Sequence, residues 1–555
     1  MIGAEILLKS LEKQGVKDIF GYPGGAVLPL YNVLNQQKDI RHILVRHEQA
    51  AALAADGYAR SSGKVGVCLA TSGPGATNLV TGIANAFLDS IPMVAITGQV
   101  ATSLIGTDAF QEVDITGICM PICKQTYQIR KAEDIPSVVA EAFYIAKNGR
   151  PGPVLIDLPK DIQEKEVKKI TFPTKVDIAG FKPVLEGNLA QIKKAHKLIE
   201  ESNFPVVLAG HGVVLAKAEK EFITFVEKLQ APVLTTLLAM GSLPKNHDLN
   251  FGMLGMHGQL AANFAVHHSD LVIGIGLRFD DRILGNPQKF APSAKVIHID
   301  IDRAEIGKNR VCDIPIVGDV KLIIPKITEK LKAKDHQKWL SQVKKWDEQK
   351  KEKTQSKKSK NMSAREVIKM ISKITKGEAI VAADVGQNQM WTANFYDFTS
   401  PRNHLSSGGL GDMGFGVPAA MGAKVAFPEK EVLAIVGDGG FQMNMQELMT
   451  LMQDKINIKI IILNNGFLGM VRQWQELFYN KNYSYTPLLS PDFIMLANSF
   501  GLKAERFFDL KKAEIGFKKA LKHQGPYLLE MITEKEENVF PMVSPGNSLK
   551  ETRLE

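Results

Sequence analysis

Short apolar runs alternate with longer Ala-rich or amphipathic segments along most of this chain. The first block, residues 1–165, contains the apolar runs 64–71 and 91–98, which we interpret as buried strands. The Ala-rich run 76–90 lies between them and is typical of a helix. Buried strands that alternate with helices form parallel sheets covered on both faces. The pattern therefore predicts an α/β domain with a doubly wound parallel sheet.

The same alternation continues in two further blocks and predicts three consecutive doubly wound α/β domains. The second block spans 185–335 and the third spans 362–533, followed by a C-terminal tail, 534–555. A chain of 555 residues suits three domains of ordinary size. The apolar runs that we interpret as strands are 204–210, 231–236, 270–276 and 294–302 in the second block, and 378–384, 431–438, 458–465 and 527–533 in the third.

The net charge of +9 is concentrated in the segment that joins the second block to the third. Residues 331–360 hold eleven lysines against four acidic residues. We interpret the segment 336–361 as a solvated helix that runs into a polar linker. Binding of RNA or of an acidic partner is the alternative for this segment; the rest of the chain is nearly neutral, and we predict no nucleic-acid partner.

The chain shows no signal for a membrane or for export. No stretch reaches 18 uninterrupted apolar residues, so we expect no membrane span. Residues 1–20 already read as a helix followed by a strand rather than as a targeting peptide. The expected location is the cytoplasm, or an organelle whose own genome encodes the protein.

Four cysteines are too few for a disulfide framework in a chain of this length. Cys119 and Cys123 have the spacing C-x3-C without a nearby pair of histidines. A zinc site is one interpretation of this pair. We favour reduced, partly buried thiols.

Asp438 and Asn465 each follow an apolar run of the third block, and one predicted helix separates them. Parallel strands joined by one helix can lie side by side, so both side chains are expected at the same edge of the sheet. A carboxylate and an amide oxygen are hard ligands suited to Mg²⁺, and Gly437, Gly439 and Gly440 allow phosphates to approach the backbone. The alternative is an ordinary strand–helix–strand unit with two glycine turns; together, at this spacing, the residues favour a metal–diphosphate site.

Glu48 is the second candidate for chemistry. It lies just past the apolar strand 42–45 and at the start of an Ala-rich helix. A carboxyl group in such an apolar setting is suited to sharing a proton with a ring nitrogen. The plainer interpretation is a glutamate that stabilises the positive end of the helix dipole.

These residues resemble the thiamin-diphosphate enzymes, and a larger set narrows the resemblance to the catalytic subunit of the acetolactate synthase family. GDGG at 437–440 with Asn464-Asn465 is similar to the superfamily's diphosphate motif, and residues 46–60 are similar to the segment with its activating glutamate. The family segments cover essentially the whole chain and are, in order, 21–31, 71–86, 106–115, 149–161, 253–258, 279–282, 406–423 and 468–479.

The resemblance implies a fold, a reaction and partners. The three domains would bind the thiamin pyrimidine, FAD in a Rossmann-like central domain, and the diphosphate with Mg²⁺. The family decarboxylates pyruvate on thiamin diphosphate and ligates the two-carbon unit to pyruvate or 2-oxobutyrate, in the biosynthesis of branched-chain amino acids. The resemblance also implies a homodimer or larger homo-oligomer, with Glu48 reaching the diphosphate site of the other subunit, and a small regulatory subunit. A pyruvate-oxidase-like flavoenzyme is the alternative.

The family's functional positions map onto named residues here. The implied catalytic residues are Gly25, Glu48, Phe110, Gln111, Lys160, Arg278, Met413 and Trp474. The implied contacts of thiamin diphosphate are Tyr22, Pro23, Glu48, Thr71, Pro74, Asn78, Gln111, Val385, Gly386, Gln387, Asn388, Gly411, Met413, Gly437, Asp438, Gly439, Gly440, Asn465, Phe467, Met470 and Val471. The implied metal ligands are Asp438, Asn465 and the backbone carbonyl of Phe467. The implied FAD contacts are Arg150, Gly210, Thr236, Leu237, Met256, His257, Gly276, Arg278, Asp280, Arg282, Asp300 and Asp319.

Several of these positions have distinct roles by resemblance. Glu48 would bond the aminopyrimidine ring, and Met413 would form the apolar wedge between the cofactor's two rings. Arg278 would receive the carboxylate of the acceptor, a charge-assisted contact, and Trp474 would set the preference for 2-oxobutyrate. For Trp474 and Phe110, core packing is the plainer interpretation of the residues alone.

Two positions depart from the family pattern. Asn388 stands where the family generally has histidine, and Asp412 stands where it generally has threonine. Asparagine still offers hydrogen bonds to a phosphate but carries no positive charge. Asp412 places an additional carboxylate beside the wedge Met413. We expect activity to remain and the affinity for the cofactor to be the property affected.

Overall fold

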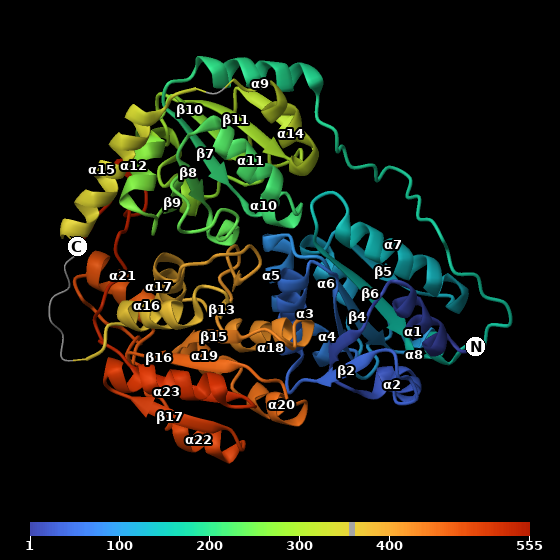
Figure 1. The fold of residues 1–555 in the computed structure, drawn as a ribbon. Helices are drawn as coiled ribbons and strands as arrows, with labels where there is room; N and C mark the ends of the chain where they lie inside the picture. Colours follow the sequence, from blue (N-terminus) through green and yellow to red (C-terminus); the bar gives the residue numbers. More distant parts are fainter. Residues whose placement is uncertain (333, 354–360) are drawn as a thin grey trace.

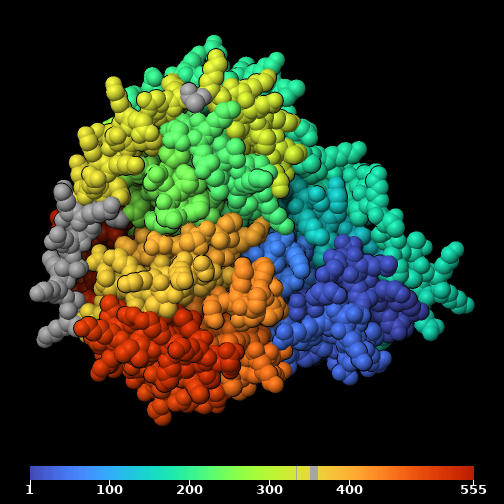
Figure 2. Space-filling view, in the orientation of Figure 1, coloured from blue at the N-terminus to red at the C-terminus, as the bar shows by residue number. Residues whose placement is uncertain are grey.

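The structure, a computed structural model, describes residues 1–332, 334–353 and 361–555. In these residues it contains three parallel six-stranded sheets, each covered by helices, in three units that follow one another along the chain (Figure 1). This confirms the predicted fold class. The space-filling view shows the C-terminal unit in contact with both of the others (Figure 2).

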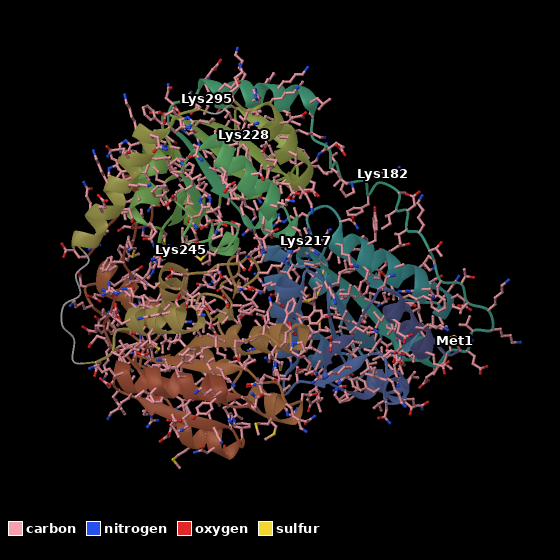
Figure 3. All side chains as sticks on the ribbon, viewed as in Figure 1. Met1, Lys182, Lys217, Lys228, Lys245 and Lys295 are labelled. Atoms are coloured by element: carbon pink, nitrogen blue, oxygen red, sulfur yellow. The ribbon has the colours of Figure 1, made fainter. Side chains whose placement is uncertain are left out.

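The first sheet has the strand order β2-β1-β3-β4-β6-β5. It is followed by an extended connection, residues 165–188, that runs along the outside of the molecule and carries the exposed Lys182 (Figures 1 and 3). Its strands are β1 (Asp18–Gly21), β2 (Arg41–Leu44), β3 (Gly66–Ala70), β4 (Met93–Gln99), β5 (Gln125–Gln128) and β6 (Pro153–Pro159). Its helices are α1 (Gly3–Lys13), α2 (Leu28–Leu34), α3 (Glu48–Ser62), α4 (Pro74–Asn78), α5 (Val80–Asp89), α6 (Ile115–Cys119), α7 (Ile135–Lys147) and α8 (Lys160–Glu164).

The central sheet has the order β12-β11-β10-β7-β8-β9. Numbered from its own first strand, this is the order of the dinucleotide-binding Rossmann fold. Its strands are β7 (Pro205–Ala209), β8 (Val233–Thr235), β9 (Asn250–Met253), β10 (Leu271–Ile275), β11 (Lys295–Asp300) and β12 (Ile314–Val317). Its helices are α9 (Leu189–Glu201), α10 (His211–Leu215), α11 (Glu219–Leu229), α12 (Leu260–His268), α13 (Asp281–Leu284), α14 (Val320–Lys330) and α15 (Gln337–Lys353).

The third sheet, β14-β13-β15-β16-β18-β17, repeats the strand order of the first when each is numbered from its own first strand. The first and third units therefore share one topology. Its strands are β13 (Ile380–Ala383), β14 (His404–Ser406), β15 (Val432–Gly437), β16 (Lys459–Asn464), β17 (Lys503–Phe507) and β18 (Tyr527–Ile532). Its helices are α16 (Ala364–Thr375), α17 (Gln387–Phe395), α18 (Gly416–Ala426), α19 (Asp438–Met443), α20 (Glu447–Gln453), α21 (Gly469–Phe478), α22 (Phe493–Ser499) and α23 (Leu510–Lys522).

Helices α3 and α18 join the first and third units at backbone distance. A Cβ atom on Gly57 would lie 2.2 Å from the carbonyl oxygen of Ala419, and one on Gly422 would lie 1.8 Å from that of Ala54. Residues of both helices share one hydrophobic cluster. Glycine at these positions lets the two helices pack without intervening side chains.

Two sequence predictions about helices need correction. The run 76–90 forms two helices, α4 and α5, rather than one. The lysine-rich helix α15 is not solvated on all sides: Trp339, Leu340 and Val343 are buried, and the Trp339 indole donates to the carbonyl of Pro205 at 3.0 Å. A stripe of apolar residues among the lysines accounts for this packing on the central unit. The predicted linker residues 354–360 lie outside the described part of the chain.

The C-terminal tail crosses from the third unit to the central one. Glu537 accepts a hydrogen bond from the Ala364 N–H at 2.8 Å, and further along the Val543 N–H donates to Met256 at 2.7 Å. None of the described helices combines the length and apolarity needed to cross a membrane. All four cysteines are free thiols, and three of them, Cys68, Cys119 and Cys123, are buried.

Candidate active site

Two neighbouring strands bring Asp438 and Asn465 to the same edge of the third sheet. β15 and β16 pair in parallel, with Gly437 opposite Leu463. Asp438 and Asn465 each follow directly after one of these strands, and both line one small cavity. The structure therefore places the two side chains together, as the spacing predicted.

Glycines keep the backbone close around this small cavity. A Cβ atom on Gly440 would lie 2.9 Å from the carboxyl carbon of Asp384, and one on Gly439 would lie 2.9 Å from the Leu468 side chain. A Cβ atom on Gly469, which lines the same cavity, would lie 2.2 Å from an oxygen of Gln387. Larger residues would collide with these neighbours, so glycine is what allows the backbone to pack this closely at the small cavity.

The polar atoms at the small cavity fit a divalent cation. Burial raises the pKa of Asp438 to about 7, so ionisation of this carboxyl is unfavourable without a nearby positive charge. The Asn465 amide oxygen accepts the Phe467 N–H at 3.0 Å and keeps a second lone pair. Together with a backbone carbonyl, these are the hard oxygen ligands that Mg²⁺ prefers. The donor set fits the predicted metal.

Most residues predicted to contact the diphosphate half of the cofactor line the small cavity. Gly411 lines a larger neighbouring cavity instead, and Met413 lines both. The predicted residues at the small cavity are Val385, Gly386, Gln387, Asn388, Met413, Gly437, Asp438, Gly439, Gly440, Asn465, Phe467, Met470 and Val471.

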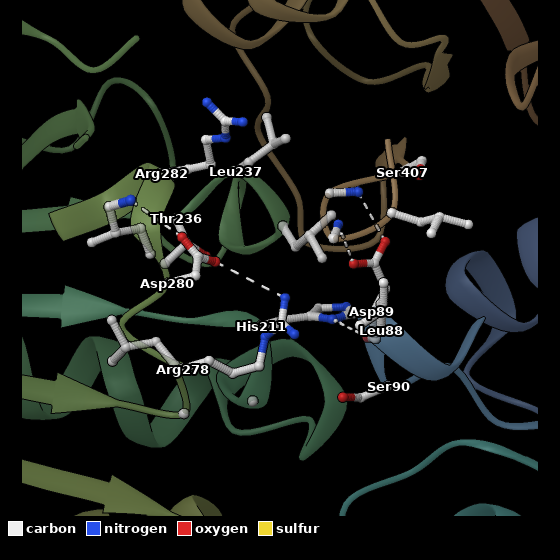
Figure 4. A pocket seen from close by; sticks show the side chains of 18 of the residues that line it. Leu88, Asp89, Ser90, His211, Thr236, Leu237, Arg278, Asp280, Arg282 and Ser407 are labelled. Carbon is white, nitrogen blue, oxygen red and sulfur yellow. Dashed lines mark hydrogen bonds and ion pairs between the residues drawn. The ribbon is translucent and has the colours of Figure 1, made fainter. Parts of the chain in front are cut away.

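The larger cavity, of about 880 Å³, lies where the three units meet (Figure 4). Its volume is typical of a site for a large cofactor or drug-sized ligand. The residues predicted to contact FAD that line it are Arg150, Thr236, Leu237, Met256, His257, Gly276, Arg278, Asp280, Arg282, Asp300 and Asp319. Gly210 is not among the lining residues; a Cβ atom there would lie 2.0 Å from the Gly276 carbonyl oxygen, so it supports the turn that lines the cavity.

Several groups around the larger cavity lack the partners that a buried polar group requires. Among the described residues, His257 Nδ1 and Glu305 Oε2 are buried without a hydrogen-bond partner. Burial raises the pKa of Asp300, which ends β11, to about 7. A carboxyl at this strand end of a Rossmann-like sheet suits a ribose hydroxyl. The residues present therefore fit a dinucleotide cofactor.

The structure also brings three residues with predicted catalytic roles to the larger cavity: the two expected to contact the acceptor, Arg278 and Trp474, and the predicted cofactor wedge, Met413. Trp474 packs edge-to-face on Phe478 with ring centroids 5.4 Å apart, and the Arg278 guanidinium lies 4.0 Å from the Asp280 carboxylate. The Arg278 guanidinium, the Met413 side chain and the Trp474 indole thus line one space beside the small cavity.

The thiamin-contacting residues predicted in the first unit form a separate cluster. Glu48 is the first residue of α3, and its carboxylate accepts a hydrogen bond from the Asn78 amide at 2.9 Å. Nearby, a Cβ atom on Gly73 would lie 2.8 Å from the Gln111 carbonyl oxygen. Phe110 is 88% exposed. In the described part of the chain, none of the following lines either cavity: Tyr22, Pro23, Gly25, Glu48, Thr71, Pro74, Asn78, Phe110, Gln111 and Lys160.

The two residues that depart from the family pattern are both buried. The Asn388 amide nitrogen donates to the carbonyl oxygens of Asp384 at 2.7 Å and Ile435 at 3.3 Å, so its donors are engaged by backbone. Asp412 Oδ2 is buried and has no hydrogen-bond partner among the described residues. Asp412 is therefore a carboxyl whose ionised form the fold does not stabilise.

The buried carboxyl of Asp412 should make the stability of the folded protein depend on pH. Burial raises the pKa of Asp412 to about 7, and repulsion from Asp384 and Asp56 adds to the rise. An aspartate in an unfolded chain has a pKa near 4, so the stability that goes with the protonated form is complete below about pH 4 and is lost as the pH rises through 7. The free energy of unfolding of Asp412→Asn should therefore increase relative to that of the unchanged protein between pH 5 and pH 8. We expect this increase to be about 1–3 kcal/mol.

Thermal unfolding of both proteins between pH 5 and pH 8 measures this difference. An unfolding midpoint that differs by the same amount at every pH would contradict the assignment. Asp492→Asn is the matched control, because Asp492 caps α22 at the exposed surface of the same unit. We expect Asp492→Asn to change the free energy of unfolding by the same amount at every pH above 5.

Some cavity residues were not singled out from the sequence. They come from the end of α5, from α10 and from the loop before α18, and they are Leu88, Asp89, Ser90, His211, Ser407, Gly408 and Gly409. A usable sequence signal was present for their neighbours: Asp56 and Arg60 stand four residues apart in an otherwise small and apolar helix. Charged residues at that spacing on a buried helix indicate a buried ion pair.

Comparison with known proteins agrees with this site. Residues 1–118, 192–327 and 384–531 match the N-terminal TPP binding domain, the central domain and the C-terminal TPP binding domain of the thiamine pyrophosphate enzymes. The fold and the site therefore define a thiamine-pyrophosphate-dependent enzyme.

Full-length relatives narrow the class. A probable acetolactate synthase large subunit of Methanocaldococcus jannaschii is 50% identical over 99% of this chain and 94% of its own length. The acetolactate synthase large subunit of Corynebacterium glutamicum is 48% identical over 99% and 89%, and an acetolactate synthase of Arthrospira platensis is 48% identical over 98% and 96%. The chain belongs to the acetolactate synthase family.

Proposed function

We propose that this chain is the catalytic subunit that forms 2-acetolactate from two molecules of pyruvate, and 2-aceto-2-hydroxybutyrate from pyruvate and 2-oxobutyrate, in the biosynthesis of branched-chain amino acids. One observation carries the proposal: Met413, Arg278 and Trp474 face one cavity that adjoins the pocket of Asp438 and Asn465. This arrangement provides for a cofactor and for an anionic acceptor side by side.

Bound thiamin diphosphate supplies the electron sink for decarboxylation. The protein's own residues position it and the substrates. Asp438, Asn465 and the Phe467 carbonyl would hold Mg²⁺ with the diphosphate, and Met413 would contact the rings of the bound cofactor. The Arg278 guanidinium binds the carboxylate of the second keto acid, and Trp474 bounds the space for its alkyl group. FAD in the larger cavity has a structural role in this proposal.

Glu48 acts on the cofactor of the other subunit in this proposal. Its cluster in the first unit lines neither cavity of its own chain, whereas a ring nitrogen must come within hydrogen-bond distance of the carboxyl for a proton to pass. Exposed apolar side chains accompany both half-sites, as expected for surfaces that a second copy covers. They are Leu104, Phe110, Ile118 and Met120 in the first unit, and Val471, Phe478, Tyr479 and Leu489 in the third.

A small regulatory subunit is the further partner that we propose. Two of the relatives compared above are named large subunits, which supports a second, smaller chain in this protein's assembly. The cytoplasmic location and the absence of a nucleic-acid partner stay predictions from the sequence.

Product analysis tests the proposed reaction. The purified chain is incubated with pyruvate, thiamin diphosphate, Mg²⁺ and FAD, with and without 2-oxobutyrate, and the products are identified by nuclear magnetic resonance. We expect 2-acetolactate alone in the first case and both acetohydroxy acids in the second. Sustained bleaching of the flavin with formation of acetate under anaerobic conditions would instead indicate a pyruvate-oxidase reaction.

Trp474→Leu tests the proposed acceptor pocket. Loss of the indole removes the surface against which the ethyl group of 2-oxobutyrate packs, and one methylene in such a pocket changes the ratio by about tenfold or more. We expect the ratio of 2-aceto-2-hydroxybutyrate to 2-acetolactate from mixed acceptors to fall by about tenfold. Trp474→Phe keeps an aromatic surface and serves as the control with a smaller change. An unchanged ratio in the leucine variant would remove Trp474 from the acceptor pocket.

A further inference from the structure

A loop without helix or strand contributes to both cavities. Residues 407–414, which we call the Met413 loop, connect β14 to α18. Ser407, Gly409 and Met413 line the larger cavity, and Met413 also lines the smaller one. Because the loop has no backbone ladder of its own, its shape depends on the groups that bind its peptide N–H groups.

The carboxylate of Asp89 binds the start of this loop. Its two oxygens accept the N–H of Gly408 at 2.9 Å and the N–H of Gly409 at 2.7 Å. Asp89 is the last residue of α5 in the first unit and is 2% exposed. Figure 4 shows its side chain directed at the segment that carries Ser407. A buried carboxylate thus joins one domain to the cavity wall of another.

The middle of the Met413 loop depends on the first unit as well. The Ser407 hydroxyl accepts the N–H of Gly411 at 3.0 Å and of Asp412 at 2.9 Å. This hydroxyl is oriented by donating its own proton to the Asn85 amide oxygen, at 2.6 Å. Asn85 lies one turn before Asp89 on α5.

The third anchor of the loop comes from its own unit. Asp384 accepts the N–H of Gly414 at 3.0 Å and of Gly416 at 3.1 Å. Of the three side chains that bind this loop's N–H groups, Asp89 therefore acts directly from the first unit, and Ser407 acts through Asn85. Among the described residues, Asp384 alone binds the loop's N–H groups independently of the first unit.

Asp89 is itself held in a buried network. Arg60, which is 5% exposed, donates to Asp89 at 2.8 Å and also to Asp56, and its guanidinium lies 5.3 Å from the ring centroid of Phe415. Asn85 donates to Asp56 at 3.2 Å. Buried ion pairs contribute little net stability because both charges are removed from water. Here the ion pairs with Arg60 hold the Asp89 carboxylate in one orientation.

The central unit also contacts this residue. His211 Nδ1 bonds the backbone carbonyl of Asp89 at 3.1 Å, and burial lowers the pKa of His211 to about 3, so the ring is neutral and donates. Asp89 therefore lies at the junction of all three units, with its side chain on the loop and its carbonyl on α10.

We propose that Asp89 is a positioning residue, which from the first unit of the same chain holds the Met413 loop, and through it Met413, in the geometry that the thiamin cofactor requires. This inference rests on the proposed role of Met413. It gives the first unit of each chain two tasks, with Glu48 serving the other subunit's site and Asp89 serving the site of its own chain.

Asp89→Asn tests the proposal with little change of shape. The amide keeps one oxygen that accepts hydrogen bonds. Its NH₂ group can only donate, and it would face another donor from Gly408, Gly409 or Arg60. We expect the dissociation constant of thiamin diphosphate at saturating Mg²⁺ to rise by about tenfold or more. Quenching of the protein's tryptophan fluorescence by added thiamin diphosphate measures this dissociation constant, because Trp391 and Trp474 line the two cavities. The circular dichroism band of the bound cofactor should weaken as well.

A matched control separates positioning from stability. In the central unit, Asp270 likewise accepts two peptide N–H groups, from Asn203 at 2.7 Å and Phe204 at 3.0 Å, together with the hydroxyl of Ser202, and it lines neither cavity. We expect Asp270→Asn to lower the unfolding midpoint while the affinity for the cofactor stays within about twofold. An Asp89→Asn protein that binds the cofactor as tightly as the unchanged protein would overturn the proposal, as would an equal loss of affinity in Asp270→Asn.

A second variant covers the case in which Asp89→Asn does not fold. Asp89→Glu keeps the negative charge beside Arg60, which favours folding, but its longer side chain displaces the carboxylate from the N–H groups of Gly408 and Gly409. A rise of about threefold in the dissociation constant is therefore expected. No rise would overturn the proposal. Failure of the proposed function is recognised separately, because the unchanged protein would then form no acetohydroxy acid or would not bind thiamin diphosphate at all.

Discussion

Glu48→Gln is expected to lower the rate of acetolactate formation by about 100-fold or more, within the range that positioned acid–base groups contribute. Glutamine keeps an oxygen for the hydrogen bond from Asn78 but cannot take up a proton. The fold and the affinity for thiamin diphosphate should change little, since the side chain keeps its size. Steady-state rates at saturating cofactor measure the effect, and deuterium exchange of the cofactor's thiazolium C2 proton locates it at the activation step.

The control for this variant addresses the plainer interpretation of Glu48 as a helix-start residue. Glu5 lies in the first turn of α1 and lines neither cavity. If a helix-start carboxylate mattered only through the helix dipole, Glu5→Gln and Glu48→Gln would have similar small effects on stability, each about 0.3–1 kcal/mol, and no effect on turnover. Equal turnover in both variants and the unchanged protein would exclude Glu48 from proton transfer.

Asp438→Asn is expected to abolish measurable activity at ordinary concentrations of Mg²⁺ and thiamin diphosphate. Of the three proposed ligands, Asp438 alone carries a charge, and the substitution leaves only neutral oxygens to hold the cation. Metal affinity, measured by titration with Mg²⁺ at fixed thiamin diphosphate, should fall by about 100-fold or more. Asp492→Asn makes the same change of charge at an exposed helix cap of the same unit and should leave the affinity unchanged.

The raised pKa of Asp438 makes the same site sensitive to pH. With its pKa at about 7 before the metal binds, a proton competes with Mg²⁺ for the carboxylate. The concentration of Mg²⁺ needed for half-maximal activity should therefore rise as the pH falls from 8 to 6. Activity that needs no added metal after exhaustive chelation would contradict the proposed ligand set.

The two inactive variants together test the shared active site. In a dimer of one Glu48→Gln chain and one Asp438→Asn chain, one site receives both defects and the other receives neither. Random pairing makes about half of the dimers mixed. Co-expression should therefore restore about a quarter of the unchanged protein's activity. No recovery would indicate that each chain builds its site alone.

The sequence predicted that Asp438 and Asn465 lie together at the small cavity, because that arrangement follows from local rules. Asp438 and Asn465 stand at the ends of two apolar runs joined by one helix, and neighbouring parallel strands then bring them to one edge. Asp300 likewise stands at a strand end, that of β11, although it was assigned from the family resemblance. Residues at strand ends can be placed from periodicity alone.

The Met413 loop was beyond that reasoning. Its shape depends on Asp89, which is distant in sequence and belongs to another sheet, and no pattern along the chain indicates which N–H groups this carboxylate binds. Trp339 shows a different limit, because its burial on the central unit was hidden by the lysines around it. Contacts between units arise from docking of whole surfaces rather than from periodicity.

The close packing of α3 on α18 has a consequence for how the chain is made. Gly57 meets Ala419 at backbone distance, and the two helices share one hydrophobic cluster, yet Ala419 leaves the ribosome long after Gly57. Until then the first unit exposes the Ala-rich face of α3 to the solvent of the cell, and such nascent apolar surfaces are prone to aggregation. The first unit therefore keeps an uncovered apolar surface until the third unit has been synthesised and docks on it.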